Sequence, residues 1–138
     1  MDDLGRILLA DDEENFLMAT KEILQDQGYQ CDCAADAATA AKMLESAEYD
    51  LLISDIKMPG NDELEFIETL PQLAEGMPVI LVTGYPSTKT AIHSVELPVV
   101  AYIAKPFNYD DLLEKMQSSI KSFRVFRIAR DMQKNVEN

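Results

Sequence analysis

Residues 50–60, Asp-Leu-Leu-Ile-Ser-Asp-Ile-Lys-Met-Pro-Gly, hold the plainest structural signal in the chain. Leu51 to Ile53 form a short apolar run, which is typical of a strand that is buried on both faces of a parallel sheet. The run ends in a carboxylate, Asp55, and Met58-Pro59-Gly60 then breaks the chain into a loop. The stretch therefore predicts a central strand that delivers an acidic side chain to one end of a sheet.

Similar apolar runs recur on both sides of this strand, and amphipathic segments separate them. Further strands are predicted over residues 7–10, 29–34, 79–82 and 99–104. Helical spacing of apolar residues predicts helices over residues 14–27, 36–47, 62–70 and 87–96, and a long last helix from Asn108.

Five strands that alternate with five helices indicate a doubly wound α/β fold, because parallel strands need crossover connections. The strand over residues 29–34 alternates between apolar and polar side chains, so it belongs at an edge of the sheet. The strand order 2-1-3-4-5 of flavodoxin-like three-layer sandwiches satisfies this requirement. We therefore predict a five-stranded parallel sheet with helices on both faces.

Length and composition fit one globular domain: 138 residues, of which 47% are hydrophobic and 27% charged. No apolar stretch approaches the roughly 20 residues that span a bilayer. The acidic start Met1-Asp2-Asp3 lacks the basic residues of a signal peptide. We therefore expect a cytoplasmic protein with no membrane partner. Cys31 and Cys33 are interpreted as small apolar strand residues and His93 as a surface residue.

The net charge of −13 is spread unevenly along the chain. Residues 121–138 carry five Lys or Arg and two Asp or Glu, a charge of +3, so the rest carries −16. Such an acidic body repels nucleic acid, and no direct nucleic-acid contact is expected. It favours a bound cation or a basic protein partner.

Chemically useful side chains follow four of the predicted strands. Asp11 and Asp12 follow the first, Asp55 the third, Thr83 the fourth and Lys105 the fifth. In an open parallel sheet, ligands bind at the carboxyl ends of the strands, where the strand order reverses. Strands one and three are neighbours there, so the three carboxylates are expected to converge.

Three neighbouring carboxylates repel one another unless a cation lies among them, and oxygen ligands suit a hard ion such as Mg²⁺. Lys105 adds a positive charge and Thr83 a hydroxyl. A carboxylate nucleophile, a divalent cation and an ammonium group are the parts needed to accept a phosphoryl group. The alternative is that each residue only caps a helix or forms a turn, which is common for a single strand-end Asp.

Four segments together resemble the receiver domain of two-component response regulators, the CheY-like domain. They are residues 7–13 (Ile-Leu-Leu-Ala-Asp-Asp-Glu), 50–60, 79–84 (Val-Ile-Leu-Val-Thr-Gly) and 101–107 (Ala-Tyr-Ile-Ala-Lys-Pro-Phe). The resemblance covers about residues 6–122, nearly the whole chain.

The resemblance implies a role for each residue that matches a motif. These roles are Asp55 as phosphoacceptor, Asp12 as direct Mg²⁺ ligand, Asp11 as ligand through water, the Lys57 carbonyl as the last protein ligand, Lys105 as partner of the phosphoryl group, Thr83 and Tyr102 as switch residues, and Pro106 as a cis proline.

The implied function is Mg²⁺-dependent phosphorylation of Asp55 by a histidine kinase, a phosphotransfer protein or a small phosphodonor. It would switch the surface around residues 87–104 to control an output domain or a downstream protein. Such a domain catalyses only its own phosphorylation and dephosphorylation. Large side chains at Lys57 and Tyr85 predict slow loss of the phosphoryl group. Candidate kinase contacts are Asn15, Phe16, Met18, Ala19 and Glu22.

A plain receiver ends near residue 122, but here the helical pattern continues. We therefore predict a receiver domain over residues 1–122 and a helical extension or linker over 123–138. Phe123, Phe126 and Ile128 are expected to extend past the sheet as a partner surface, either for a homodimer or toward an output domain. The alternative is a frayed amphipathic tail.

Two other classes of protein fit less well. An aspartyl-nucleophile phosphatase needs a general acid two residues after the nucleophile, where this chain has Lys57, and a cap insertion for which it has no room. An FMN-binding flavodoxin-like protein needs a Ser/Thr/Gly-rich loop after the first strand, where this chain has an acidic one, residues 11–14.

Overall fold

The computed structural model describes residues 4–137, so the acidic N-terminus Met1-Asp2-Asp3 lies outside the described residues. Its five strands form one parallel sheet in the order β2-β1-β3-β4-β5, which confirms the predicted fold class. The strands are β1 (Arg6–Ala10), β2 (Gln30–Ala34), β3 (Leu51–Ser54), β4 (Val79–Thr83) and β5 (Val99–Ala104).

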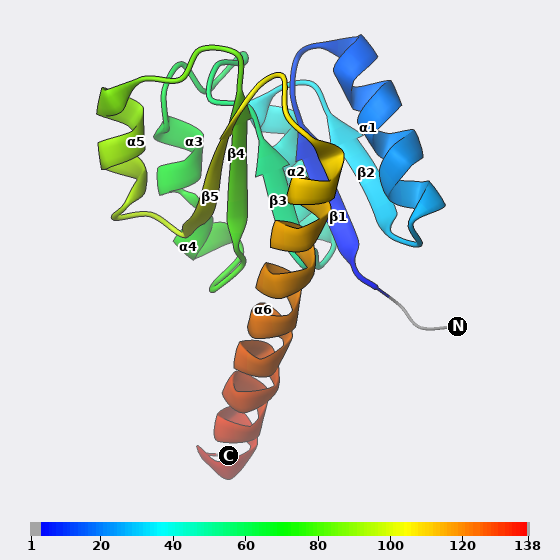
Figure 1. Ribbon diagram of the computed structural model, residues 1–138. Helices are drawn as coiled ribbons and strands as arrows, with labels where there is room; N and C mark the ends of the chain where they lie inside the picture. The colour runs from blue at the N-terminus through cyan, green and yellow to red at the C-terminus, as the bar shows by residue number, and fades with distance from the viewer. Residues whose placement is uncertain (1–3, 138) are drawn as a thin grey trace.

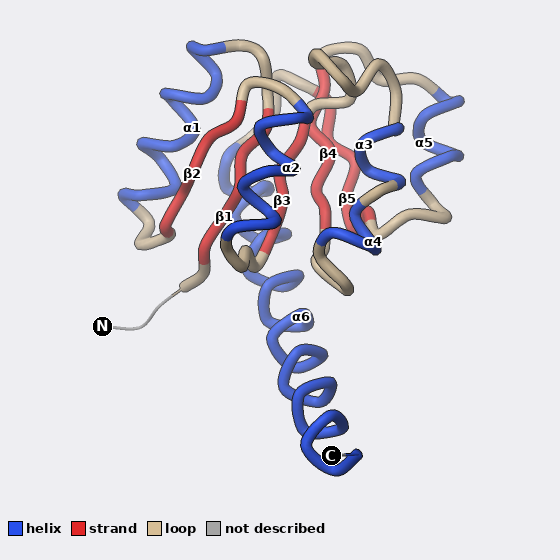
Figure 2. Tube along the Cα trace, turned by 180° about the vertical axis from the view of Figure 1, so that it is seen from behind, coloured by secondary structure: helices blue, strands red, loops and turns tan. Residues whose placement is uncertain are grey.

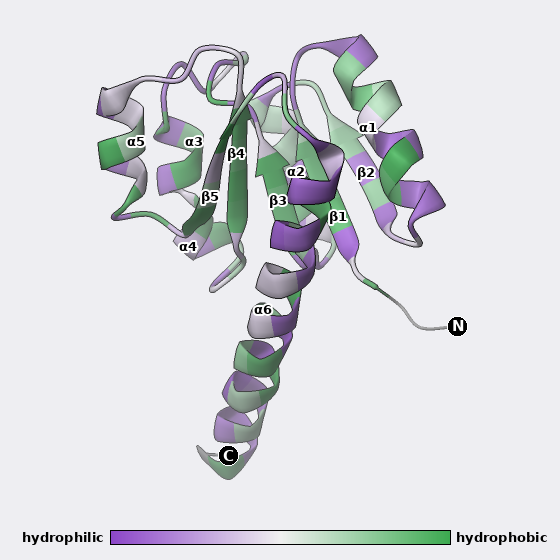
Figure 3. Ribbon diagram, in the orientation of Figure 1, coloured by the Kyte–Doolittle hydropathy of each residue, from purple (hydrophilic) through white to green (hydrophobic). Residues whose placement is uncertain are grey.

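Helices cover both faces of the sheet (Figures 1 and 2). One face is covered by α1 (Glu14–Asp26) and α6 (Tyr109–Glu137), whose apolar residues join one core cluster. The other face is covered by α2 (Ala37–Ser46), α3 (Glu65–Glu68) and α4 (Leu70–Leu73), and α5 (Thr88–Ser94) lies beside α3. The central strands are the most hydrophobic part of the molecule (Figure 3), as expected where a strand is buried on both faces.

The prediction of one helix over residues 62–70 was wrong. Residues 62–64 belong to a loop, and two four-residue helices, α3 and α4, follow with Thr69 between them. Pro71 explains the break, because it has no N–H group to donate to the carbonyl of Ile67 and its ring crowds that carbonyl.

The last helix, α6, is a continuous helix of 29 residues. It begins after Asn108, whose side chain accepts a hydrogen bond of 2.8 Å from the N–H of Asp110, as a helix cap does. The expectation that Phe123 extends past the sheet was wrong, because its ring is only 7% exposed and joins the core. Phe126 and Ile128, at 42% and 62% exposure, do extend outward.

Within residues 4–137, no helix combines the length and the hydropathy that crossing a membrane requires.

Candidate functional site

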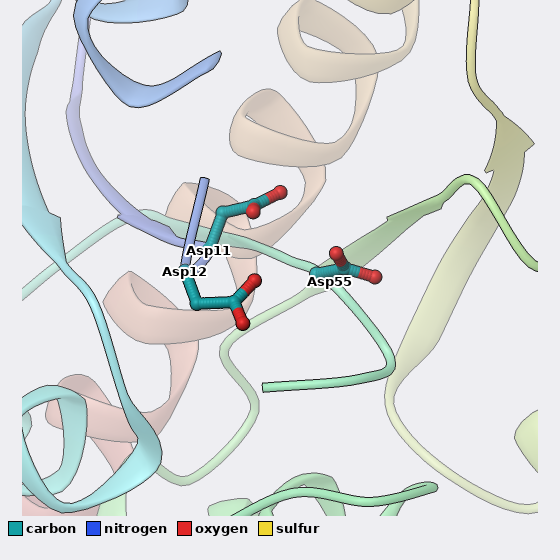
Figure 4. Close-up of side chains that lie close together, drawn as sticks. All are labelled: Asp11, Asp12 and Asp55. Carbon is teal, nitrogen blue, oxygen red and sulfur yellow. The ribbon is translucent and has the colours of Figure 1, made fainter. Parts of the chain in front are cut away.

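Three carboxylates meet where β1 and β3 end. These strands are paired neighbours, with Ala10 opposite Ser54, so the residues that follow them emerge side by side. Oxygens of Asp11, Asp12 and Asp55 all lie within 4.8 Å of one another (Figure 4). The predicted convergence is therefore present in the fold.

The two oxygens of the Asp55 carboxylate have different surroundings. Oδ1 accepts hydrogen bonds from the N–H groups of Ile56, at 2.6 Å, and Lys57, at 3.3 Å. Oδ2 lies 3.6 Å from the ammonium nitrogen of Lys105. Because the residue is only 6% exposed, these contacts fix the direction of the carboxylate and turn Oδ2 toward the cation.

Lys105 reaches into the carboxylate cluster from the end of β5. Its Nζ atom lies 2.6 Å from Oδ2 of Asp11 and 3.0 Å from Oε1 of Glu13. The aromatic ring of Phe16 also borders Lys105, with its centre 4.1 Å from Nζ. With only 14% of its side chain exposed, Lys105 is held as a charged partner of the cluster.

Burial and ion pairing have opposite effects on the pKa values of Asp11 and Lys105. Burial raises the pKa of Asp11 above its ordinary value, although hydrogen bonds from Lys105 and from the N–H of Glu13 counteract part of the effect. For Lys105, burial lowers the pKa, but its hydrogen bonds to Asp11 and Glu13 outweigh burial and the pKa is raised. The ammonium group therefore stays charged at neutral pH.

Asn61 organises the loop after β3, although no sequence motif pointed to it. Its side chain is fully buried; its amide donates to the carbonyl of Ile56 at 2.9 Å and more weakly to that of Asp55 at 3.4 Å, and its oxygen accepts from the N–H of Phe66. Its backbone also pairs with Met58. These partners are brought together only by the folded loop, so no local pattern could identify them.

Thr83 ends β4 and is buried. Its hydroxyl oxygen accepts a hydrogen bond of 3.0 Å from the N–H of Tyr85. The Lys57 side chain is exposed, and its ammonium nitrogen lies 5.4 Å from the centre of the exposed Tyr85 ring. These two large side chains thus lie near each other, one on the β3–α3 loop and the other on the β4–α5 loop.

Tyr102 points toward α5, away from the carboxylates. Its hydroxyl oxygen accepts from the N–H of Ser87 at 3.1 Å and shares a hydrogen bond of 2.8 Å with the hydroxyl of Thr90. Ser87 is also the N-cap of α5. Tyr102 therefore connects β5 to the first turn of α5. The peptide bond between Lys105 and Pro106 is cis, the isomer that the resemblance implies.

Three other polar residues considered in the sequence lie outside this site. His93 is on α5, and its Nε2 atom lies 2.8 Å from Oε1 of Glu68. Cys31 and Cys33 are unpaired thiols on β2, the first buried and the second partly exposed.

The family model described as "Response regulator receiver domain" matches residues 7–117. The chain is 30% identical to a putative response regulator NtrX-like of Rickettsia bellii over 94% of this chain, but it spans only 28% of that relative. It spans 24% of another relative, the regulatory protein AtoC of Escherichia coli, which is also 30% identical over the matched part.

Solved structures agree with this assignment. A CheY-like response regulator receiver domain protein from Methanospirillum hungatei is 37% identical, with a TM-score of 0.83, over 88% of this chain and 98% of that one. The response regulator TrrA of Thermotoga maritima, solved in complex with Mg²⁺-BeF, is also 37% identical, with a TM-score of 0.74, over 83% and 97% of the two chains. The chain therefore belongs to the family of response regulator receiver domains.

Proposed function

We propose that Asp55 is the phosphoacceptor of this receiver domain and that its phosphorylation requires Mg²⁺. One observation carries the proposal: Oδ2 of Asp55 faces the Lys105 ammonium group 3.6 Å away, in a cluster with the carboxylates of Asp11 and Asp12. A nucleophilic oxygen, a fixed cation and further metal-type ligands thus share one pocket.

The donor set fits Mg²⁺, because every candidate ligand is a hard oxygen and the carboxylates lie within reach of one ion. Asp12 and Asp55 would bind the ion directly, Asp11 through water, and the backbone carbonyl of Lys57 would complete the protein ligands. A bound Mg²⁺ would supply a Lewis acid that offsets negative charge on the transferred phosphoryl group.

In the transfer itself, Oδ2 of Asp55 attacks the phosphorus of the donor. The bond between phosphorus and the leaving group breaks, and the leaving group departs with the electron pair, so the product is an acyl phosphate. The hydrogen bonds from the N–H groups of Ile56 and Lys57 orient the carboxylate. Lys105 neutralises charge on the phosphoryl oxygens.

The switch that follows rests on the two residues that border the β4–α5 loop. The Thr83 hydroxyl, whose oxygen accepts a hydrogen bond from the Tyr85 N–H, would donate a hydrogen bond to a phosphoryl oxygen. Tyr102 holds the other end of the loop through Ser87. Movement of this loop would change the surface of α5 and β5, which is the surface offered to an output domain or a downstream protein.

The partners that we propose are a histidine kinase or a phosphotransfer protein on the input side, in the cytoplasm. Of the candidate contacts on α1, Asn15, Met18, Ala19 and Glu22 are exposed and Phe16 is half-buried beside Lys105.

On the output side, the exposed apolar residues of α6 would meet an output domain, a downstream protein or a second copy of the chain; they are Val125, Ile128, Met132 and Val136. The boundary between residues 122 and 123 stays a prediction.

The site assignment can be tested by chemical trapping. After incubation with acetyl phosphate and Mg²⁺, borohydride reduces an aspartyl phosphate to homoserine, and peptide mapping locates it. We expect homoserine at residue 55. Homoserine at Asp11 or Asp12 instead would overturn the assignment. The TrrA structure, solved in complex with Mg²⁺-BeF, supports the requirement for Mg²⁺.

A further inference from the structure

A second cluster of charges lies at the opposite end of β3 from Asp55. Asp50 directly precedes β3, and its side chain is only 7% exposed. Its Oδ2 accepts a hydrogen bond of 2.9 Å from the N–H of Arg6. From α6, a guanidinium nitrogen of Arg127 lies 2.9 Å from Oδ1 and one of Arg124 lies 3.4 Å from Oδ2. A buried carboxylate thus joins β1 and β3 to α6.

Aromatic contacts reinforce this junction. The Arg127 guanidinium also lies 5.1 Å from the centre of the buried Phe123 ring. That ring belongs to the core cluster on the far face of the sheet, so α6 reaches around the end of the sheet. The neighbouring Phe126 ring packs so closely on Gly76 that a Cβ there would lie 2.3 Å from it. Phe123, Arg127 and part of the otherwise exposed Phe126 ring therefore contact the receiver body.

We propose that Asp50, Arg124 and Arg127 form a latch that fixes the direction of α6, so that its outer residues 128–137 project as one rigid output arm. The latch accounts for why this helix keeps a defined course beyond the sheet (Figure 1). Burial opposes ionisation of Asp50, but the Arg6 N–H and the two guanidinium groups outweigh it and lower the pKa of this carboxyl. The latch is therefore charged at neutral pH.

The arm is connected to the phosphorylation pocket at two points. Along the chain, α6 begins four residues after Lys105, which binds Asp11. Through the sheet, the latch residue Asp50 and the acceptor Asp55 flank the same four-residue strand, β3. The latch thus ties the direction of α6 to the strand that precedes Asp55. The proposal stands whether or not Asp55 is the phosphoacceptor.

Backbone hydrogen exchange on the full chain tests the latch. Asp50→Asn keeps an acceptor for the Arg6 N–H but removes the charge that binds the arginines. We expect exchange at residues 124–134 to rise roughly tenfold or more, with the amides of β1, β3 and β4 nearly unchanged. Asp111→Asn is the matched control, because it breaks an exposed ion pair with Lys115 on the same helix and should leave those amides unchanged.

The double variant Arg124→Gln, Arg127→Gln removes the two cations of the latch, which are partly exposed. It tests the latch even if Asp50→Asn does not fold. Adding Asp50→Asn to it should give little further acceleration, because the latch is already open. Unchanged exchange in the arginine variant, or an equal rise over the whole chain, would overturn the latch. Asp55→Asn should keep slow exchange in α6, which separates failure of the latch from failure of the phosphoacceptor assignment.

Discussion

The ammonium nitrogen of Lys105 lies 2.6 Å from Oδ2 of the fully buried Asp11. The chain thus brings its own cation to a carboxylate that would otherwise be buried as an unbalanced charge. The carboxylate cluster is stable in the fold because Lys105 offsets part of its repulsion, and Mg²⁺ binding would offset more.

Replacing Lys105 by Gln removes that cation, and the buried Asp11 then faces Asp55 with no positive partner. In Mg²⁺-free buffer we expect the free energy of unfolding to fall by about 2–4 kcal/mol. Saturating Mg²⁺ should restore part of this loss, because the ion binds the folded state only. Urea denaturation with and without Mg²⁺ measures both effects.

The matched control for this substitution is Asp12→Asn, which removes one of the repelling charges from an exposed position. Its unfolding free energy without Mg²⁺ should not fall, and its stabilisation by Mg²⁺ should be weaker than that of the native chain. A Lys105→Gln variant as stable as the native chain in Mg²⁺-free buffer would contradict the charge balance.

Asn61→Ala should loosen the loop that follows Asp55. The substitution leaves the buried carbonyl of Ile56 and the N–H of Phe66 without their partner, so we expect a loss of about 1–3 kcal/mol in the free energy of unfolding. Calorimetric titration should also show weaker Mg²⁺ binding. Asn15→Ala, at an exposed position of α1, serves as the control, and equal losses in both variants would argue against a special role for Asn61.

The pH dependence of stability should reveal the charged state of Asp50. Burial alone would raise its pKa, but the Arg6 N–H, Arg124 and Arg127 outweigh burial, so its folded pKa lies below the unfolded value of about 4. Its contribution is therefore fully present above that value and is lost as the pH falls through the folded pKa.

Denaturation curves of the native chain and Asp50→Asn from pH 7 to pH 2 check this sign. The variant should be less stable by about 1.5–3 kcal/mol at pH 7, and the difference should shrink as the pH drops below about 4. A difference that stays constant down to pH 2 would mean that the carboxylate charge is not what stabilises the junction.

Lys57 and Tyr85 follow the ends of β3 and β4, and the Lys57 ammonium nitrogen lies 5.4 Å from the centre of the Tyr85 ring. Both should hinder water from attacking the acyl phosphate in line. We expect each Ala variant to lose its phosphoryl group severalfold faster than the native chain after acetyl phosphate is removed. Loss of the label from the native chain within seconds would contradict slow dephosphorylation.

Much of the fold could be predicted from the sequence because its signals are local. Buried strands are continuous apolar runs, and the alternating residues 29–34 correctly identified the edge strand β2. The split between α3 and α4 was missed because the predicted helix was ended just before Pro71, whereas the break lies at Thr69 and Pro71 belongs to the first turn of α4. The burial of Phe123 was also missed, because its ring packs against core residues that come from other parts of the chain.

The candidate site also contains residues that local sequence signals predict and residues that only tertiary contacts reveal. Asp11, Asp12 and Asp55 could be brought together from strand order alone, because the ends of neighbouring parallel strands are adjacent. Asn61 and Asp50 could not be selected in this way. Each owes its importance to partners that only the folded chain supplies, such as the Phe66 N–H and the guanidinium of Arg127.

The most direct test of the central claim is the intact mass of the chain after incubation with acetyl phosphate, with and without Mg²⁺, for the native protein and for Asp55→Asn. We predict a gain of one phosphoryl group that requires Mg²⁺ and is absent from the variant. No gain by the native chain under any condition, or an equal gain by Asp55→Asn, would contradict the assignment of Asp55 as the phosphoacceptor.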